Sequence, residues 1–208
     1  MSQTIIPRAA VQGTATGVLF MAFFGTLWAG IGVGGLEGWG FAWLLTLSLL
    51  IGVALLLAGL LLIRAARGLS NEMTEEDARR ERTWRLFGII FGLEGVFIGA
   101  AGAICNAANR FDLFFSVMAI IVGAHFFPLA YLFRVKVHYI AGTLLCLLAV
   151  VGLLLVPYDT VLGQHQIEMR SVVVGFGSAI ILWGTGASVW MIGRRLLDKA
   201  RNGSGAGL

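Results

Sequence analysis

The chain has 208 residues, of which 58% are hydrophobic and only 12% are charged, whereas a soluble domain is typically about 25% charged. This composition excludes an ordinary soluble protein and indicates an integral membrane protein. The formal net charge of +4 is explained by basic loops on one side of a membrane, so we expect no nucleic-acid partner.

Six apolar stretches are long enough to cross a hydrocarbon core of about 30 Å, which takes roughly 20 helical residues each. They cover residues 17–35, 41–63, 87–107, 112–133, 137–157 and 171–193. Backbone groups in lipid must be hydrogen-bonded internally, and the alternating pattern of a membrane barrel is absent, so the stretches should be helices. The predicted fold is all-α: one bundle of six transmembrane helices over residues 1–201, with the lipid bilayer as its surroundings.

The segments around these spans have their own signals. The first apolar stretch continues to full spanning length without a small-residue cleavage site, so we expect it to remain in the protein. Thr74 as an N-cap, followed by Glu75 and Glu76, predicts a helical connector over about 72–86 that runs into the third span. The final residues 202–208, NGSGAGL, are low in complexity and typical of an expression linker, so we expect a flexible tail there.

The basic residues predict the orientation. With the N-terminus inside, every Lys and Arg except Arg110 and Arg170 falls on the cytoplasmic side, as the positive-inside rule requires. Both termini are therefore expected in the cytoplasm, with the chain in a bacterial inner membrane. The spans form three antiparallel pairs, and each pair ends at an arginine (Arg64, Arg134 and Arg194), which permits a threefold repeat of a two-helix unit.

Glycines concentrate in the first, third and sixth spans. In the third span, Gly88, Gly92, Gly95 and Gly99 recur at helical spacing. Since no hydrophobic force draws helices together in lipid, such small residues act by letting backbones approach closely. We expect the third helix to be central and tightly packed, within one bundle or between subunits of a homo-oligomer. Candidate partner faces are Gly30 and Gly34 of the first span and Gly175, Ala179, Gly184 and Ser188 of the sixth.

Two ionisable residues lie deep in adjacent spans. Glu94 is about 10 Å and His125 about 13 Å below the same membrane edge at 1.5 Å per residue. Residues at matched depth on antiparallel neighbours can hydrogen-bond, and a lone charge there would be costly. Pro128 cannot donate to the carbonyl of Ala124, so the helix is expected to kink beside His125.

The Glu94–His125 pair has two interpretations. In one, it only ties the third and fourth helices together. In the other, it lines a hydrated path that carries a proton or a small polar solute, as is common for intramembrane ionisable groups. No third ligand matches the depth of His125, so we expect no metal site.

The turn between the third and fourth spans reads CNAANRFD and holds Asn106, Asn109, Arg110 and Asp112. These side chains either cap a turn between helices or form the outer mouth of the path to Glu94. Both interpretations remain open from the sequence.

Known catalytic signatures and phosphate-binding glycine loops are absent from the sequence, so we expect neither enzymatic activity nor a cofactor. The leading hypothesis is a small transporter or channel for a solute or ion, linked to protons through Glu94 and His125. The alternative is a non-catalytic membrane scaffold or stress protein that binds a partner through its cytoplasmic helix. A membrane enzyme acting on lipid or quinone has the least support.

The stretch GLEGVFIGAAGAICNAANRFDLFFSVMAIIVGAHFFPLAYLFR, about a fifth of the chain, resembles uncharacterised bacterial six-helix membrane proteins. The pairing of helices is similar to that of the bacterial acid-resistance membrane protein family. The resemblance implies a six-helix membrane fold and transfers no functional residue.

Overall fold

The computed structural model describes residues 8–69 and 76–205. Its elements are α1 (Arg8–Gly34), α2 (Phe41–Ala66), α3 (Glu76–Ala107), the short 3-10 helix η1 (Phe111–Leu113), α4 (Phe114–Phe133), α5 (Val137–Leu155), β1 (Thr160–Leu162), β2 (His165–Ile167) and α6 (Met169–Gly205). Six of the helices are long and apolar enough to cross a membrane. The prediction of an all-α, six-span protein is therefore confirmed.

Three of the helices extend beyond their predicted spans. α1 begins at Arg8, α3 runs without a break from Glu76 into the membrane span, and α6 continues to Gly205. The helical connector is thus present in its described part, whereas the N-cap expected at Thr74 lies outside the described residues. α6 therefore continues into the segment expected to be a flexible tail, and the tail stays a prediction.

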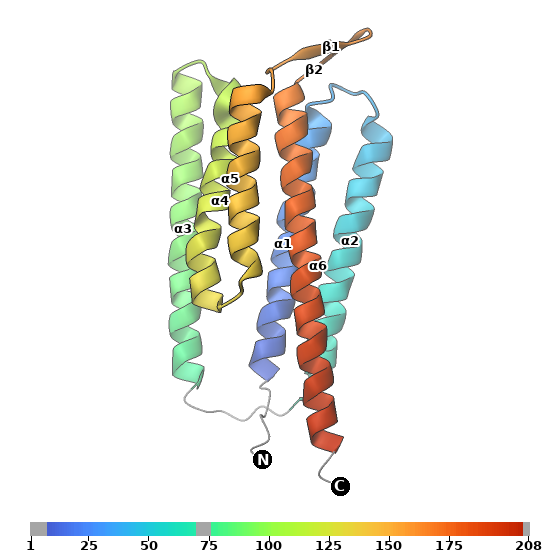
Figure 1. Cartoon of the computed structure of the whole chain (residues 1–208), viewed down its shortest axis with the longest axis vertical. Helices are drawn as coiled ribbons and strands as arrows, with labels where there is room; N and C mark the ends of the chain where they lie inside the picture. The colour runs from blue at the N-terminus through green and yellow to red at the C-terminus, as the bar shows by residue number, and fades with distance from the viewer. Residues whose placement is uncertain (1–7, 70–75, 206–208) are drawn as a thin grey trace.

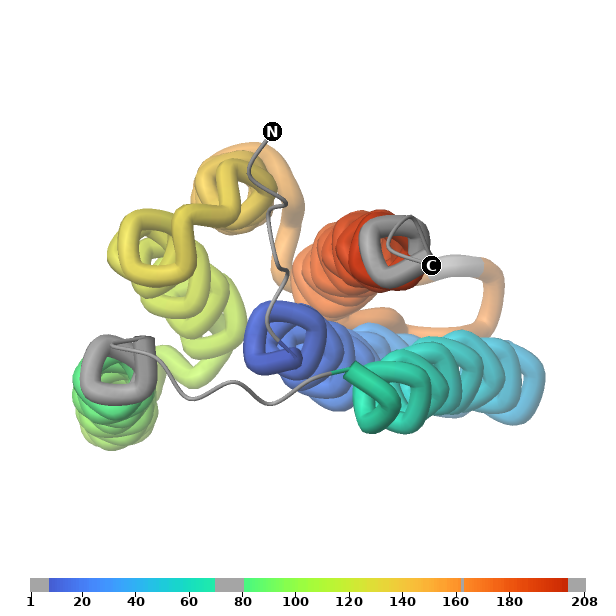
Figure 2. Tube along the Cα trace, turned by 90° about the horizontal axis from the view of Figure 1, so that it is seen from below, coloured from blue at the N-terminus to red at the C-terminus, as the bar shows by residue number. Residues whose placement is uncertain are grey.

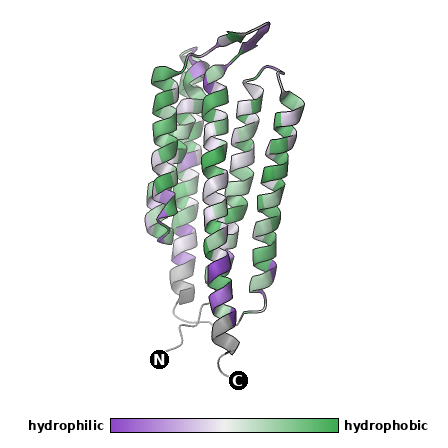
Figure 3. Cartoon of the chain, turned by 45° about the vertical axis from the view of Figure 1, so that its right-hand side comes forward, coloured by the Kyte–Doolittle hydropathy of each residue, from purple (hydrophilic) through white to green (hydrophobic). Residues whose placement is uncertain are grey.

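The bundle has two distinct ends (Figure 1). α1 begins and α6 ends at one of them, together with the turn at Arg134 between α4 and α5. We call it the basic end. At the other, the hairpin end, β1 and β2 pair antiparallel with Thr160 opposite Ile167. Figure 3 shows hydrophobic residues along the helices between the two ends, and hydrophilic ones on the hairpin and the lower part of α6.

The helices form two groups of three. α1, α2 and α6 pack together, α3 and α5 pack on α4, and the groups meet along α6, which contacts α5 and α4. Figure 2, viewed from the basic end, shows α1 at the centre and α3 at the edge. Each predicted two-helix unit is in contact, and α1 with α2 is one of the most extensive pairs. The most extensive contact, between α1 and α6, cuts across these units, as does the contact between α4 and α5. The threefold repeat stays a prediction.

Close packing through small residues occurs in the centre of the bundle. Gly175 of α6 lies directly against the backbone of Gly32 of α1. Likewise, a Cβ atom added at Gly142 of α5 would lie 2.6 Å from the carbonyl oxygen of Gly123 of α4. Glycine at these positions lets the two helix pairs approach closely, as expected for packing in lipid.

The third helix differs from the prediction. α3 packs on α4 at the edge of the molecule, and a Cβ atom added at Gly88, Gly92, Gly95 or Gly99 would meet nothing within 4 Å. The expectation of a central, tightly packed third helix is wrong for the single chain. Glycine spacing indicates that a face can accept close approach, but it does not identify the partner. Packing of this face against another subunit stays a prediction.

Candidate functional site

The structure brings Glu94 of α3 and His125 of α4 together. The Oε1 atom of Glu94 lies 3.3 Å from Nδ1 of His125, and the two side chains are only 8% and 13% exposed. The antiparallel arrangement of α3 and α4 puts them at matching depth, as the helical rise predicts. An acid and a base therefore meet inside the membrane-spanning region.

The carboxyl group of Glu94 is incompletely bonded. Nδ1 of His125 lies 2.6 Å from the carbonyl oxygen of Val122, and since a carbonyl can only accept, Nδ1 must carry a hydrogen and donate it there. Glu94 Oε1 can at most share that hydrogen. Glu94 Oε2 is buried and has no hydrogen-bond partner among the described residues. The site thus has room for one further donor, which a proton or a ligand can supply.

A cavity of about 1100 Å³ reaches from this pair to the basic end. Arg8, Trp84 and Arg134 line its mouth at the basic end. Glu94 and His125 lie partway along it, and Ile31, Ile98 and Met118 continue the lining toward the hairpin end. Its walls come from α1 and α6 on one side and from α3, α4 and the start of α5 on the other, so it separates the two helix groups. Its volume is near the upper end of about 300–1,000 Å³ for ligand pockets.

One wall of the cavity is aromatic. Phe20 and Phe24 of α1 meet Phe87 and Phe91 of α3, with ring centroids 5.6 Å apart for Phe20 and Phe87 and 5.9 Å apart for Phe24 and Phe91. All four rings line the cavity. We call them the phenylalanine seam. The seam joins the two helix groups beside the cavity, on the side away from the contacts of α6 with α4 and α5.

The sequence analysis missed His138, the second residue of α5. Its side chain is 6% exposed and lines the same cavity, and its Nδ1 has no hydrogen-bond partner in the described part of the chain. The ring of Phe126 lies between the two imidazoles, 4.7 Å from His125 and 5.6 Å from His138. The span predicted at 137–157 put His138 at the membrane edge, two residues from Lys136. Its burial comes from contacts of α5 with α4, including the rings of Phe126 and Phe133.

The outer turn is held by a backbone hydrogen bond and an ion pair, and η1 and α4 begin without a side-chain cap. Asn109 has a positive φ of 53°, and its N–H donates to the carbonyl of Asn106 at 3.1 Å. Arg110 makes two contacts with Asp112, at 3.0 and 3.2 Å, and this bond raises the pKa of Arg110. None of the four residues lines the cavity, and both interpretations of this turn stay predictions.

Arg170 closes the hairpin end, a role that the sequence analysis did not assign. From the first turn of α6, its guanidinium donates to Asp112 Oδ2 at 3.3 Å, to the carbonyl of Val156 at 3.3 Å and to the carbonyl of Gly152 at 3.2 Å. These bonds join α6 to η1, which precedes α4, and to the end of α5. We call this set of bonds the Arg170 clasp.

A second set of bonds reinforces the same end. The N–H of Glu168 donates to the carbonyl of Gly35 at 2.8 Å, which links the start of α6 to the end of α1. Glu168 also accepts hydrogen bonds from Tyr158 at 2.8 Å and from Ser171 at 3.0 Å. The bond to Glu168 raises the pKa of the Tyr158 hydroxyl, so this contact persists through neutral pH. The hairpin end is therefore tied together by polar contacts.

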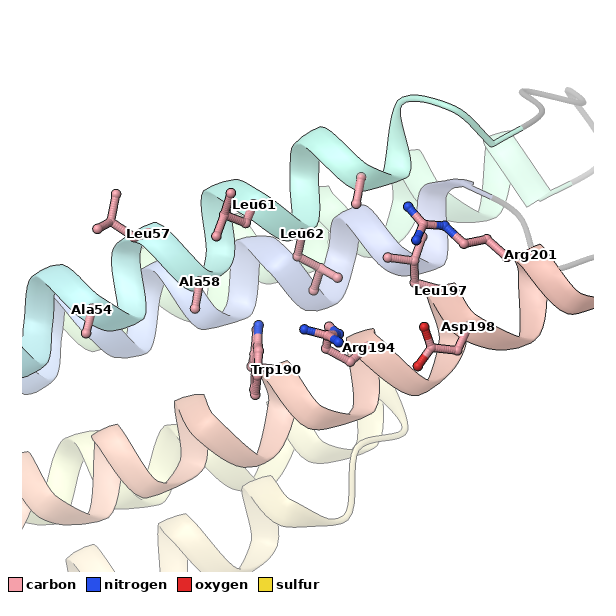
Figure 4. A pocket seen from close by; sticks show the side chains of 11 residues that line it. Ala54, Leu57, Ala58, Leu61, Leu62, Trp190, Arg194, Leu197, Asp198 and Arg201 are labelled. Atoms are coloured by element: carbon pink, nitrogen blue, oxygen red, sulfur yellow. The ribbon is translucent and has the colours of Figure 1, made fainter.

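A smaller cavity of about 420 Å³ lies between α2 and α6 (Figure 4). Leu57 and Leu61 of α2 form its apolar side, while Arg194, Asp198 and Arg201 of α6 lie at the basic end and are exposed. The Arg194 guanidinium also lies 5.3 Å from the centre of the Trp190 ring. No buried acid or base lines this cavity, so it is a surface groove rather than a second candidate site.

Comparison with protein-family models, curated proteins and solved structures gives no match for this chain. Among residues 8–69 and 76–205, no three His, Cys, Asp or Glu side chains are grouped as a metal ion would require. The evidence about function therefore lies in the cavity and in the ionisable groups that line it.

Proposed function

We propose that this protein is a membrane transporter that binds a small solute in the Glu94 cavity and couples its movement to a proton at the Glu94–His125 pair. The observation that carries the proposal is the buried, incompletely bonded carboxyl group that lines a cavity reaching the basic end of the bundle. A purely structural ion pair would need no such cavity.

The arrangement of the helices supports transport by alternating access. Two groups of three helices enclose the cavity, and the Arg170 clasp holds them together at the hairpin end. Rocking of one helix group against another around a central site is a common mechanism in secondary transporters. With the basic end in the cytoplasm, as the positive-inside rule predicts, the cavity of this conformation faces the cytoplasm.

The involvement of a proton in transport follows from the cost of burying a charge. An ionised carboxylate at this depth costs several kcal/mol unless it is neutralised. A proton on Glu94 or a donor group of the solute would each supply the missing partner. Solute and proton therefore compete for the same group, which is a physical basis for coupling.

Transport can be tested in proteoliposomes that contain a pH-sensitive dye. A panel of amines, weak acids, amino acids and sugars is added in turn, and we expect at least one class to drive a proton flux that empty liposomes lack. Glu94→Gln should abolish that flux. Glu37→Gln is a matched control, because Glu37 is exposed in the loop at the hairpin end, and this variant should behave like the unmodified protein.

The outcome also separates transport from the scaffold hypothesis. If no class gives a flux, or if a well-folded Glu94→Gln, His125→Gln double variant retains it, the transport proposal is wrong. The scaffold alternative would then be favoured.

A further inference from the structure

The chemistry of the Glu94 cavity indicates the class of solute. We propose that it binds lipophilic organic cations, with Glu94 as their counter-ion and as the site where a cation exchanges for a proton. This inference rests on the proposed transport function and narrows its substrate. Three features of the cavity carry it: the carboxyl group, the aromatic wall and the charges at the mouth.

The carboxyl group favours a positively charged ligand. Glu94 Oε2 has no partner among the described residues, and the side chain is 8% exposed. When a monovalent cation binds, the Glu94 carboxylic acid loses its proton to the cavity and the carboxylate pairs with the cation. One proton leaves for each cation bound, so the site stays neutral and avoids the cost of a lone charge in the membrane.

The wall of the cavity favours the same charge. The phenylalanine seam and Trp28 present aromatic rings to the interior, and the face of an aromatic ring attracts a cation by about 0.5–2 kcal/mol. An anion of the same size and shape would be disfavoured by both the rings and the carboxylate. The aromatic wall also provides apolar contact, which a strongly hydrated ion cannot use.

The remaining charges select lipophilic cations over inorganic ones. Besides Glu94, the ionisable groups that line the cavity are His125 from α4, His138 from α5, Arg8 from α1 and Arg134 at the end of α4. The two arginines lie at the mouth and repel a hydrated metal cation that arrives from water. A lipophilic cation dissolves in the bilayer and can reach the cavity through the phenylalanine seam, where rotation of side chains opens a passage.

A pair of probes with the same shape and opposite charge tests the class. Binding of tetraphenylphosphonium and of tetraphenylborate is measured by equilibrium dialysis to the protein in lipid nanodiscs, with empty nanodiscs as the background. We expect saturable binding of tetraphenylphosphonium only, with release of about one proton per cation bound because the site remains neutral. Lowering the pH by one unit should weaken this binding by up to about tenfold, since one proton competes with each cation for Glu94.

Variants assign the binding to the site. Glu94→Gln should abolish saturable binding, whereas Glu94→Asp, which keeps the charge, should retain it with the same dependence on pH. Phe91→Leu should weaken binding about three- to thirtyfold, as loss of one cation–π contact implies. Phe97→Leu is the matched control on α3, because Phe97 is 58% exposed and does not line the cavity; it should bind normally.

Each outcome decides the proposal. Equal binding of both probes, or binding that survives in Glu94→Gln, overturns the assignment of cations to this site. If tetraphenylphosphonium does not bind but another class in the proteoliposome panel drives proton flux, the cation inference is wrong and the transport function stands. If neither experiment gives a signal, both are wrong.

Discussion

Replacing Glu94 by Gln separates a functional carboxyl group from a structural one through stability alone. A residue that serves mainly to tie α3 to α4 should lower stability when it is replaced. A residue kept for its chemistry, with one oxygen unbonded in a buried position, should raise stability when Gln replaces it, because Gln needs no proton to be neutral. The two roles thus predict changes of opposite sign.

The magnitude follows from the contacts. An unsatisfied buried polar group costs about 1–3 kcal/mol, and more when it is charged. The amide of Gln has the same shape and is always neutral. We therefore expect the free energy of unfolding to rise by about 1–2 kcal/mol, or the melting temperature by roughly 2–8 °C for a chain of this size. His125→Gln instead removes the hydrogen bond to Val122 and should cost about 1 kcal/mol or more.

The measurement is thermal unfolding in detergent of the two single variants and the double variant. We expect Glu94→Gln to melt above the unmodified protein and His125→Gln below it. The double variant should melt above the His125→Gln single, because a neutral amide then replaces the acid that has lost its neighbour. A clear fall in melting temperature for Glu94→Gln, with recovery in the double variant, would show that the pair is a structural tie and refute the reasoning.

Three further predictions concern packing, closure and topology. Gly175→Leu should destabilise the protein by about 3 kcal/mol or more in a thermal melt, because Gly175 lies against the backbone of Gly32, whereas Gly99→Leu should leave monomer stability unchanged. A lower oligomer mass for Gly99→Leu in light scattering would place the α3 glycines at a subunit interface, and an unchanged mass would exclude them from one. Arg170→Leu should lower the melting temperature by several degrees, as loss of a buried group with three acceptors costs about 1–3 kcal/mol; an unchanged melt would mean that the Arg170 clasp contributes little. A membrane-impermeant thiol reagent added outside cells should label Gln166→Cys and not Lys199→Cys, and the reverse result would invert the predicted orientation.

The spans and the Glu94–His125 contact could be predicted because both depend on local geometry. Helical rise fixes depth, and a short turn forces α3 and α4 to be antiparallel neighbours. Two residues at matched depth on such neighbours need only the right rotation of each helix to meet. Their contact at 3.3 Å therefore required no knowledge of the rest of the bundle.

The features that sequence analysis missed depend on contacts between distant segments. The glycines of α3 signalled close approach, but the closest approach in the chain is made by Gly175 and Gly32, which are far apart in sequence. The burial of His138 and the acceptors of Arg170 likewise come from other helices. An arginine in the first turn of an apolar helix was the available signal for Arg170, since such a group needs several acceptors when it is buried.

The ionisable groups at the hairpin end and those in the cavity are bonded differently, although the uncharged Ser116 hydroxyl near the hairpin end is also buried without a partner among the described residues. The difference between the ionisable groups supports the direction of the proposed mechanism. At the hairpin end, Arg170 finds several acceptors, and both carboxylate oxygens of Glu168 accept hydrogen bonds. In the cavity, which opens at the basic end, Glu94 Oε2 and His138 Nδ1 have no partner among the described residues. Folding alone favours complete bonding, so incomplete bonding beside a cavity is expected where a ligand or a proton completes it. The end whose ionisable groups are bonded therefore serves as the closed side of this conformation, and the cavity, with its unbonded ionisable groups, as the side that receives the solute.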